Sequence, residues 1–183
     1  MTHDLLRGLF FCILGAMLFP SNVLGDSELT DAQKKKIVYQ MYADYKKDFP
    51  GVKDISPLEA MKLMKQGRLV FVDTRSPAEM KVSMLPNAVT KDEFLKDPSK
   101  YKDRTVVGYC TISYRSGLFA EKMSKKGIMI YNLSGGLLAW VLEGGKVYDA
   151  NGETKRIHVY DEEWNYPPKG YESVMFGFWD KYF

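Results

Sequence analysis

A six-residue loop that begins with a cysteine and ends with an arginine is the part of the sequence best suited to chemistry. Residues 110–115 read Cys-Thr-Ile-Ser-Tyr-Arg; they follow the apolar run 105–109 and precede a helical pattern that starts at Ser116. A thiol at such a junction meets the unpaired N–H groups and positive dipole end of the next helix, which stabilise an anion. Arg115 adds a permanent positive charge. The loop therefore suits a sulfur nucleophile, as a thiolate or carrying one extra sulfur atom.

The first 25 residues have the composition of a secretory signal peptide. Arg7 supplies a positive charge, residues 8–19 are largely apolar, and Val23-Leu24-Gly25 precedes a predicted cleavage site at Asp26. The apolar run is shorter than the roughly 20 residues that a membrane-spanning helix needs. We therefore expect a periplasmic or secreted protein, with an uncleaved segment that anchors the chain to a membrane as the alternative.

Removal of this segment leaves one cysteine, Cys110, and one histidine, His158. A single cysteine cannot form an internal disulfide. Zinc sites are built from clusters of cysteine and histidine, so neither a metal site nor a cofactor is expected. A Cys–His hydrolase needs a histidine base beside the thiol. His158 lies far along the chain, and an ordinary partly exposed side chain is expected there.

The charge balance argues against a nucleic-acid partner. The chain has 26 lysine and arginine residues against 23 aspartate and glutamate residues. A nucleic-acid-binding protein usually gathers basic side chains into a patch or stripe, and Lys34-Lys35-Lys36 is too short to form one.

Apolar runs alternate with helical patterns through the middle of the chain. The runs 69–72, 105–109 and 128–133 predict buried strands. Ser56, Ser76 and Thr90 each precede a glutamate by three residues, which predicts three helix starts. In the helical pattern that follows the cysteine loop, Leu118, Phe119 and Met123 are expected to face inward. Such alternation predicts an α/β fold in which helices cover both faces of a parallel sheet, with functional loops at the strands' carboxyl ends.

The two ends of the chain follow other patterns. Residues 28–48 predict an amphipathic helix, and Asn151-Gly152 predicts a hairpin turn within residues 146–160. The last stretch is rich in aromatic residues, which are Trp164, Tyr166, Tyr171, Phe176, Phe178, Trp179, Tyr182 and Phe183. We expect these aromatic side chains to pack across the central domain; a contact with a protein partner or a membrane surface is the alternative.

Three motifs together resemble a rhodanese domain, a sulfurtransferase module. They are Phe71-Val72-Asp73-Thr74-Arg75, the cysteine loop, and Ser134-Gly135-Gly136-Leu137-Leu138-Ala139-Trp140. The resemblance covers about residues 52–146, which leaves a signal peptide at 1–25, a helical segment at 26–51 and an aromatic extension at 147–183. It implies a rhodanese-like fold, with a five-stranded parallel sheet flanked by helices on both faces.

The resemblance also implies roles for site residues. Cys110 would be the catalytic nucleophile that accepts a sulfane sulfur as a persulfide, and Arg115 would help to bind an anionic donor. Asp73 and Arg75 would brace the loop. The backbone amides that would cradle the persulfide belong to Thr111, Ile112, Ser113, Tyr114, Arg115 and Ser116. Many members have Gly-His-Ile-Pro-Gly-Ala where this chain has residues 83–88, Ser-Met-Leu-Pro-Asn-Ala, so it lacks that histidine but keeps the proline turn.

The resulting prediction is an exported sulfurtransferase that works by a ping-pong mechanism. Its partners would be a small donor, such as thiosulfate or a persulfide, and a thiophilic acceptor. Relatives that handle phosphate or arsenate have a loop one residue longer, so the six-residue loop disfavours a phosphatase or arsenate reductase. A rhodanese-fold module that docks a partner without catalysis, or that carries sulfur to a specific protein, is the remaining alternative.

Overall fold

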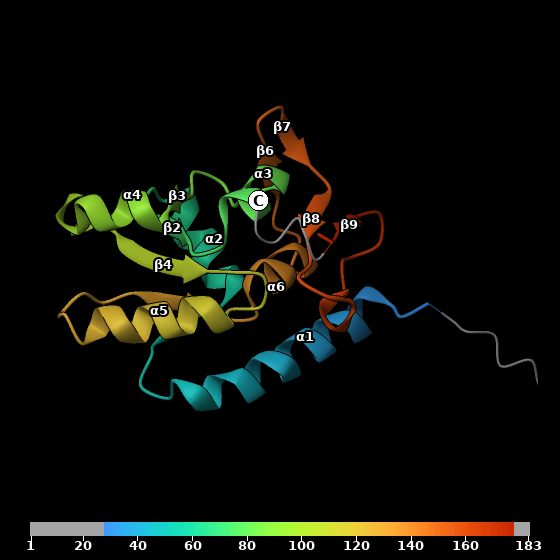
Figure 1. The fold of residues 1–183 in the computed structure, drawn as a ribbon, viewed down its shortest axis with the longest axis horizontal. Coiled ribbons are helices and arrows are strands. Elements are labelled where there is room, and N and C mark those ends of the chain that lie inside the picture. The colour runs from blue at the N-terminus through green and yellow to red at the C-terminus, as the bar shows by residue number, and fades with distance from the viewer. Residues whose placement is uncertain (1–27, 178–183) are drawn as a thin grey trace, which may run out of the picture.

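The computed structural model describes residues 28–177 (Figure 1). The predicted signal peptide and four of the tail aromatics (Phe178, Trp179, Tyr182 and Phe183) lie outside the described residues. The α-helices are α1 (Asp31–Tyr45), α2 (Pro57–Lys65), α3 (Pro77–Val82), α4 (Lys91–Lys96), α5 (Tyr114–Ser124) and α6 (Gly136–Leu142). The strands are β1 (Asp54–Ile55), β2 (Leu69–Asp73), β3 (Val89–Thr90), β4 (Thr105–Tyr109), β5 (Tyr131–Leu133), β6 (Val147–Asp149), β7 (Gly152–Thr154), β8 (Arg156–His158) and β9 (Glu172–Val174). Short 3-10 helices are η1 (Lys46–Asp48), η2 (Pro98–Tyr101) and η3 (Glu162–Trp164).

Five strands form the central sheet, in the order β1-β5-β4-β2-β3. All four pairings are parallel. The longest is between β2 and β4, where Leu69 pairs with Thr105 and Asp73 with Tyr109. The sequence-based prediction of a five-stranded parallel sheet is confirmed. Because the strands run in one direction, the residues that follow β2 and β4 meet at the same edge (Figure 1).

Helices cover both faces of this sheet, and the alternating side chains of β2 show how. Leu69 and Phe71 join the cluster that contains α2, α6 and Trp140. Val70 and Val72 join the cluster that contains α4, η2 and α5. Successive side chains of a strand point to opposite faces, so a strand buried on both faces needs the continuous apolar run that the sequence has.

The predicted helix starts are present, and each is capped by its own side chain. The hydroxyl groups of Ser56, Ser76 and Thr90 accept hydrogen bonds from the amides of Glu59, Glu79 and Glu93 at 3.2, 3.3 and 3.0 Å. At Ser76 the box is reciprocal, because the Ser76 amide donates to Glu79 Oε2 at 2.9 Å. Each cap satisfies an otherwise unpaired backbone donor.

Two sequence expectations about burial are wrong. Strand β5 begins at Tyr131 and not at Ile128, and Met129 is exposed. Leu118 is also exposed, because helix α5 turns its small residues toward the sheet. Gly117 approaches another side chain closely: a Cβ atom there would lie 2.3 Å from the ring of Phe49, so no larger residue fits at this position.

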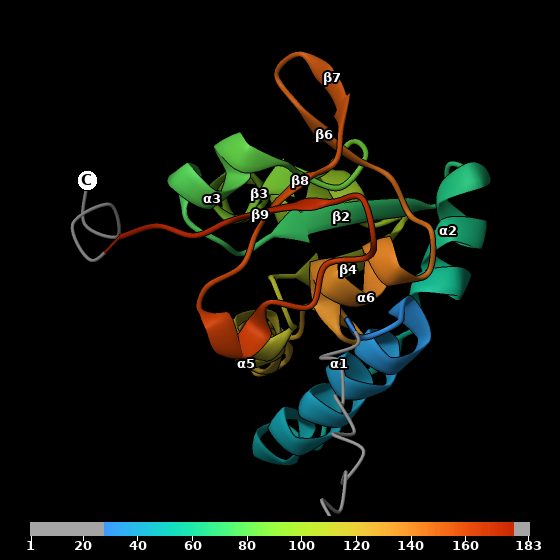
Figure 2. The same cartoon turned by 90° about the vertical axis from the view of Figure 1, so that its right-hand side faces the viewer.

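The segments before and after the central domain pack against it. Helix α1 lies along α6 and places Val38 in the same core cluster as Leu137. The C-terminal extension forms the predicted hairpin, β6 with β7, and then a parallel pair of β8 with β9 that crosses the end of the sheet (Figure 2). Ile157 and Val159 are fully buried, and Trp164 packs on the same cluster. The described part of the tail therefore packs on the core.

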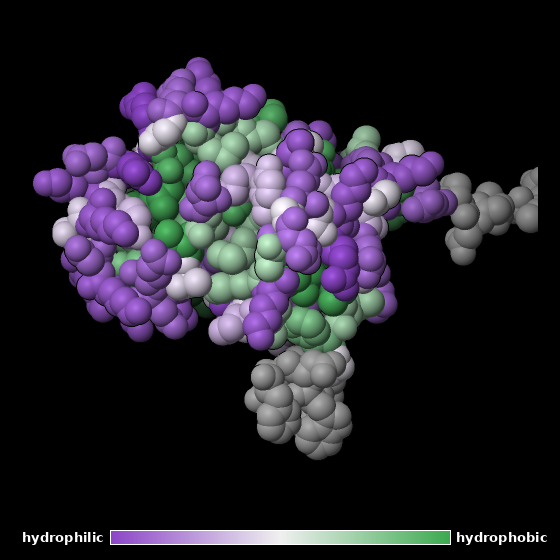
Figure 3. Space-filling view, turned by 90° about the horizontal axis from the view of Figure 1, so that it is seen from above, coloured by the Kyte–Doolittle hydropathy of each residue, from purple (hydrophilic) through white to green (hydrophobic). Residues whose placement is uncertain are grey.

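The surface seen from above carries hydrophobic residues in its middle, whereas hydrophilic residues cover the end nearest α4 (Figure 3). Among residues 28–177, no helix is long and apolar enough to cross a membrane.

Candidate active site

Cys110 lies directly after the last residue of β4 and is buried. Its Sγ atom accepts a hydrogen bond from the amide of Ser113 at 3.1 Å. Ser113 has φ of 71°, so the chain turns back sharply before α5 begins at Tyr114. The helix therefore starts beside the sulfur atom, where its positive dipole end stabilises a thiolate.

The loop is held from behind by helix α6. The carbonyl groups of Cys110 and Thr111 accept hydrogen bonds from the amides of Leu137 and Leu138 at 2.9 and 3.1 Å. In a trans peptide the N–H group points away from the carbonyl group, so the following amides face the other side of the loop. The close approach requires glycine at 136: a Cβ atom there would lie 2.5 Å from the Cys110 carbonyl oxygen.

A buried polar network supports the loop from the side of β5, and no pattern in the sequence indicates it. The side-chain amide of Asn132 donates to the carbonyl of Ser113 at 3.0 Å and to the hydroxyl of Tyr42 at 3.1 Å. Ser116 donates to Asn132 Oδ1 at 2.7 Å. Burial and a hydrogen bond to Asp54 raise the pKa of Tyr42 above its usual value, so its hydroxyl stays protonated.

Arg115 is paired on both of its terminal nitrogens. Its NH1 and NH2 groups donate to the two carboxylate oxygens of Glu79 at 2.8 and 2.7 Å. Burial opposes the charge on Arg115, but the hydrogen bonds to Glu79 and the negative charge of Cys110 outweigh it and raise the pKa of Arg115. Burial likewise opposes charge on Glu79, but bonding to Arg115 and to His158 lowers the pKa of Glu79 well below its usual range. The pair is therefore ionised beside Cys110.

His158 is not the partly exposed residue that the sequence suggested. Its side chain is 3% exposed, its Nδ1 lies 3.3 Å from Glu79 Oε1, and its ring packs on Phe176 at 4.3 Å. The prediction was wrong because strand β8 pairs with β9 across the end of the sheet and buries this position. His158 thus reaches the site through Glu79 and Arg115.

Asp73 and Arg75 form a separate buried pair at the end of β2. Arg75 donates from Nε and NH2 to Asp73 at 2.9 and 2.6 Å, and from NH2 to the carbonyl of Ser83 at 2.6 Å. The hydroxyl of Tyr109, the residue before the cysteine, donates to Asp73 Oδ2 at 2.5 Å. The pair thereby ties β2, β4 and the 83–88 turn together, and it does not line the cavity above Cys110.

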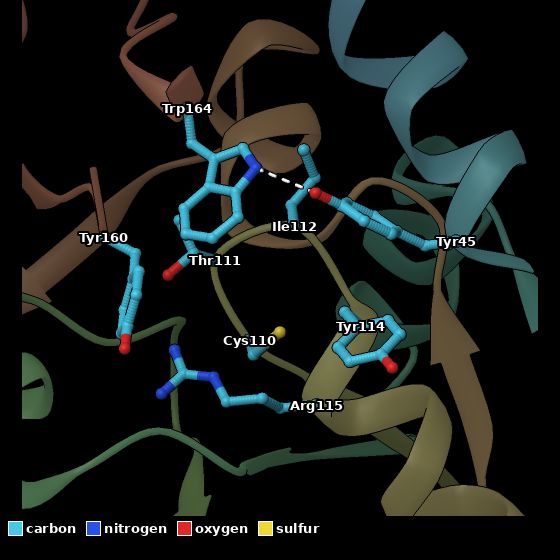
Figure 4. A pocket seen from close by; sticks show the side chains of 8 residues that line it. All are labelled: Tyr45, Cys110, Thr111, Ile112, Tyr114, Arg115, Tyr160 and Trp164. Carbon is cyan, nitrogen blue, oxygen red and sulfur yellow. Dashed lines mark hydrogen bonds between the residues drawn. The ribbon is translucent and has the colours of Figure 1, made fainter. Parts of the chain in front are cut away.

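A cavity of about 390 Å³ opens above the sulfur atom (Figure 4). Its lining consists of Tyr45, Cys110, Thr111, Ile112, Tyr114, Arg115, Tyr160 and Trp164. Five of the predicted site residues therefore meet there. Ser113 and Ser116 are buried beneath the loop instead. The sequence had shown aromatic residues near both ends of the chain, but their convergence on Cys110 depends on tertiary contacts.

Half of the residues that line the cavity are aromatic, and Arg115 is the lining residue with a permanent charge. Trp164 Nε1 donates to the hydroxyl of Tyr45 at 3.0 Å, which links the C-terminal extension to helix α1 (Figure 4). The hydroxyl of Thr111 is buried and has no hydrogen-bond partner within residues 28–177. The described part of the chain contains no group of three or more metal-binding side chains.

The central part of the chain is similar to known proteins. The family model for the rhodanese-like domain matches residues 56–143. A tRNA uridine(34) hydroxylase of Chlamydia muridarum is 30% identical over 128 residues, which cover 63% of this chain and 38% of that protein. A tRNA uridine(34) hydroxylase of Corynebacterium urealyticum is 29% identical over 121 residues, with 59% and 40% covered. The chain thus spans well under half the length of these curated relatives.

Solved structures give weaker likenesses. A thiosulfate sulfurtransferase from Pseudomonas aeruginosa has a TM-score of 0.48 at 18% identity, with 74% of this chain and 26% of that chain covered. A rhodanese-related protein from Thermoplasma volcanium has a TM-score of 0.45 at 23% identity, with 52% and 96% covered. The family match and the parallel sheet that carries Cys110 at its carboxyl edge agree: residues 56–143 form a rhodanese-like domain.

Proposed function

We propose that this protein is a sulfurtransferase that moves a sulfane sulfur through a persulfide on Cys110. In the first step the Cys110 thiolate attacks the outer sulfur of a donor R–S–SH. A new Sγ–S bond forms, the donor's S–S bond breaks, and R–S⁻ leaves with the electron pair. In the second step an acceptor thiolate attacks the outer sulfur and Cys110 leaves as a thiolate, with no net oxidation.

One observation carries the proposal: Cys110 Sγ accepts the amide hydrogen bond of Ser113 at the floor of a cavity, beside an ionised Arg115. Amide donors and a nearby cation stabilise the thiolate before attack and the persulfide anion after it. A buried structural cysteine needs neither the cavity nor the charge.

The direct test is to incubate the full-length chain with thiosulfate or with a low-molecular-weight persulfide and to measure its intact mass. We expect a gain of about 32 Da from at least one of the two donors, which is the mass of one sulfur atom added as a persulfide. Added cyanide should release thiocyanate and restore the original mass. Cys110→Ser should show neither change. A folded wild-type protein that gains no mass from either donor would contradict the proposal.

The same experiment separates the catalytic proposal from its rivals. Repeated turnover with small thiols supports an enzyme, whereas persulfide formation without turnover supports a carrier that delivers sulfur to one protein. A phosphatase or arsenate reductase is disfavoured by the six-residue loop, because relatives that handle phosphate or arsenate have a loop one residue longer. Activity on RNA, suggested by the names of the relatives, is disfavoured by the near balance of 26 basic and 23 acidic side chains.

Export is a further part of the proposal. Residues 8–19 supply the apolar core of a signal peptide, with cleavage near Gly25. The intact mass of the protein recovered from its native cells tests this. A chain that begins at Asp26 would support export, and a chain that retains residues 1–25 would contradict cleavage and favour the membrane-anchored form.

A further inference from the structure

The wall opposite the cysteine loop is supplied by segments outside the rhodanese-like domain. Tyr45 ends helix α1, whereas Tyr160 and Trp164 belong to the C-terminal extension, and the family match covers residues 56–143. Figure 4 shows Trp164 above Cys110, with Tyr45 to the right and Tyr160 to the left, and with Tyr114 and Arg115 on the loop side. The loop that reacts and the surface that would contact a substrate thus come from different parts of the chain.

The aromatic rings of this wall hold one another in place. The ring centroids of Tyr160 and Trp164 lie 5.1 Å apart, and those of Tyr45 and Tyr114 lie 5.3 Å apart. The hydrogen bond from Trp164 to Tyr45 connects the two pairs. A preformed apolar cavity of about 390 Å³ is the size that binds small organic molecules, and it is far larger than a small inorganic dianion needs.

The charges around the cavity disfavour a dianion. The positive charge of Arg115 is balanced by the carboxylate of Glu79, to which each terminal nitrogen donates one hydrogen bond. When Cys110 is a thiolate, these three groups carry one net negative charge, which repels a doubly charged donor such as thiosulfate. The cavity lining contains no carboxylate that could pair with a cationic substrate.

We infer that the cavity selects neutral thiols and persulfides with an aromatic or apolar body, and that Trp164, Tyr45 and Tyr160 determine this specificity. The inference rests on the proposed function of Cys110 and names its substrate class. The apolar body lies against the aromatic wall and leaves its water, while its sulfur atom meets Cys110 Sγ at the cavity floor.

The test begins with protein that already carries the persulfide, prepared with a donor in excess and confirmed by mass. The loaded protein then receives either benzyl mercaptan or 2-mercaptoethanol, two thiols of similar acidity, and loss of the added sulfur is followed by mass. The reaction of glutathione persulfide with the same two thiols corrects for their intrinsic reactivity. We expect benzyl mercaptan to be favoured by about tenfold or more after that correction.

Variants locate the preference. Trp164→Ala should reduce the preference for benzyl mercaptan to about twofold or less, because it removes the largest apolar surface of the wall. Tyr148→Ala is the matched control, since Tyr148 is a partly exposed aromatic residue of β6 that does not line the cavity. This control should keep the wild-type preference. Equal corrected rates for the two thiols in the wild-type protein would overturn the inference.

A binding measurement makes the inference testable even if Cys110 transfers no sulfur. Full-length Cys110→Ser is titrated with benzyl methyl sulfide, which cannot transfer sulfur, and separately with thiosulfate. Calorimetry or ligand-observed NMR should detect the sulfide and not the dianion, and Trp164→Ala should weaken sulfide binding about tenfold. Binding of thiosulfate alone would overturn the inference. Failure of persulfide formation, with the sulfide still bound, would instead count against the proposed function.

Discussion

Glu79 performs two tasks with one carboxylate: it caps helix α3, and it binds both terminal nitrogens of Arg115 in the cysteine loop. Its Oε2 accepts from the Ser76 amide at 2.9 Å and from Arg115 NH1 at 2.8 Å. The start of a helix after β2 is thus coupled to the orientation of the cation beside Cys110. The capping-box pattern identifies the first task but contains no information about the second.

The first prediction concerns the charge of Arg115. Arg115→Met should slow persulfide formation on Cys110 by about 10- to 100-fold, because it removes the positive charge that stabilises the thiolate. Arg115→Lys keeps a positive charge but loses the two parallel hydrogen bonds to Glu79. Its rate of persulfide formation should therefore lie between those of the wild-type protein and Arg115→Met. Stopped-flow alkylation and the rate of sulfur loading measure both. Equal loading by Arg115→Met and wild type would remove Arg115 from the mechanism.

The second prediction concerns pH. The pKa of Glu79 is lower in the folded protein than in the unfolded chain, where a glutamate titrates near about pH 4.3. The unfolded state therefore binds the proton first, so the stability that this group contributes is present above about pH 4.3 and is lost as the pH falls toward the folded pKa. As the pH falls from about 6 to about 3.5, the free energy of unfolding of Glu79→Gln should decrease less steeply than that of the wild-type protein.

Urea denaturation at a series of pH values measures this slope. Glu121→Gln is the control, because Glu121 forms an exposed pair with Lys125 and should reproduce the wild-type slope. Parallel curves for Glu79→Gln and wild type would mean that the carboxylate does not titrate differently on folding.

The third prediction concerns the buried pair at the end of β2. Asp73→Asn should lower the free energy of unfolding by about 3–5 kcal/mol, because it leaves the fully buried guanidinium group of Arg75 without its anion. The exposed pair of Glu121 and Lys125 again supplies the control. Glu121→Gln should change the free energy of unfolding by no more than about 0.5 kcal/mol. Chemical denaturation of both variants at neutral pH gives the two values. A cost for Asp73→Asn as small as the control's would show that the pair does not brace the sheet.

The fourth prediction separates backbone strain from steric clash. Gly67 and Gly136 both have positive φ, at 67° and 61°, but only Gly136 has atoms close to the site of a Cβ. Gly67→Ala should cost about 1–2 kcal/mol for its left-handed backbone. Gly136→Ala should cost about 1–3 kcal/mol more, because the new methyl group would displace the carbonyl of Cys110.

The midpoint of urea unfolding measures the two costs, and the rate of persulfide loading shows their effect on the loop. Only Gly136→Ala is expected to slow loading. Similar losses of stability in both variants would show that the contact between α6 and the cysteine loop is not tight.

The central sheet could be predicted because each of its determinants is local. A continuous apolar run such as 69–72 and a serine three residues before a glutamate depend on neighbouring residues alone. Cys110 was placed correctly for the same reason, since a strand followed by a helix puts its loop at the sheet edge.

The rest of the site could not be predicted because it depends on contacts distant in sequence. Tyr45 and Trp164 are 119 residues apart and meet through a single hydrogen bond. His158 is buried because β8 pairs with β9. The sequence pattern of a three-residue strand is too short to predict that pairing. Helix α5 buries Gly117 against the ring of Phe49, which comes from another part of the chain, and leaves Leu118 exposed.

Helix α1 and the C-terminal extension supply the aromatic wall, whereas the central domain supplies Cys110. The selectivity of the cavity can therefore change without a change in the reactivity of the thiol. Changes at positions 45, 160 and 164 alter what reaches the sulfur atom, while the loop and its supports at residues 73, 79, 132 and 136 stay as they are. A graft of these two flanking segments onto another rhodanese-like core would carry the choice of substrate with it. Conversely, a protein cut back to residues 56–143 would keep its nucleophile and lose the surface that distinguishes one thiol from another.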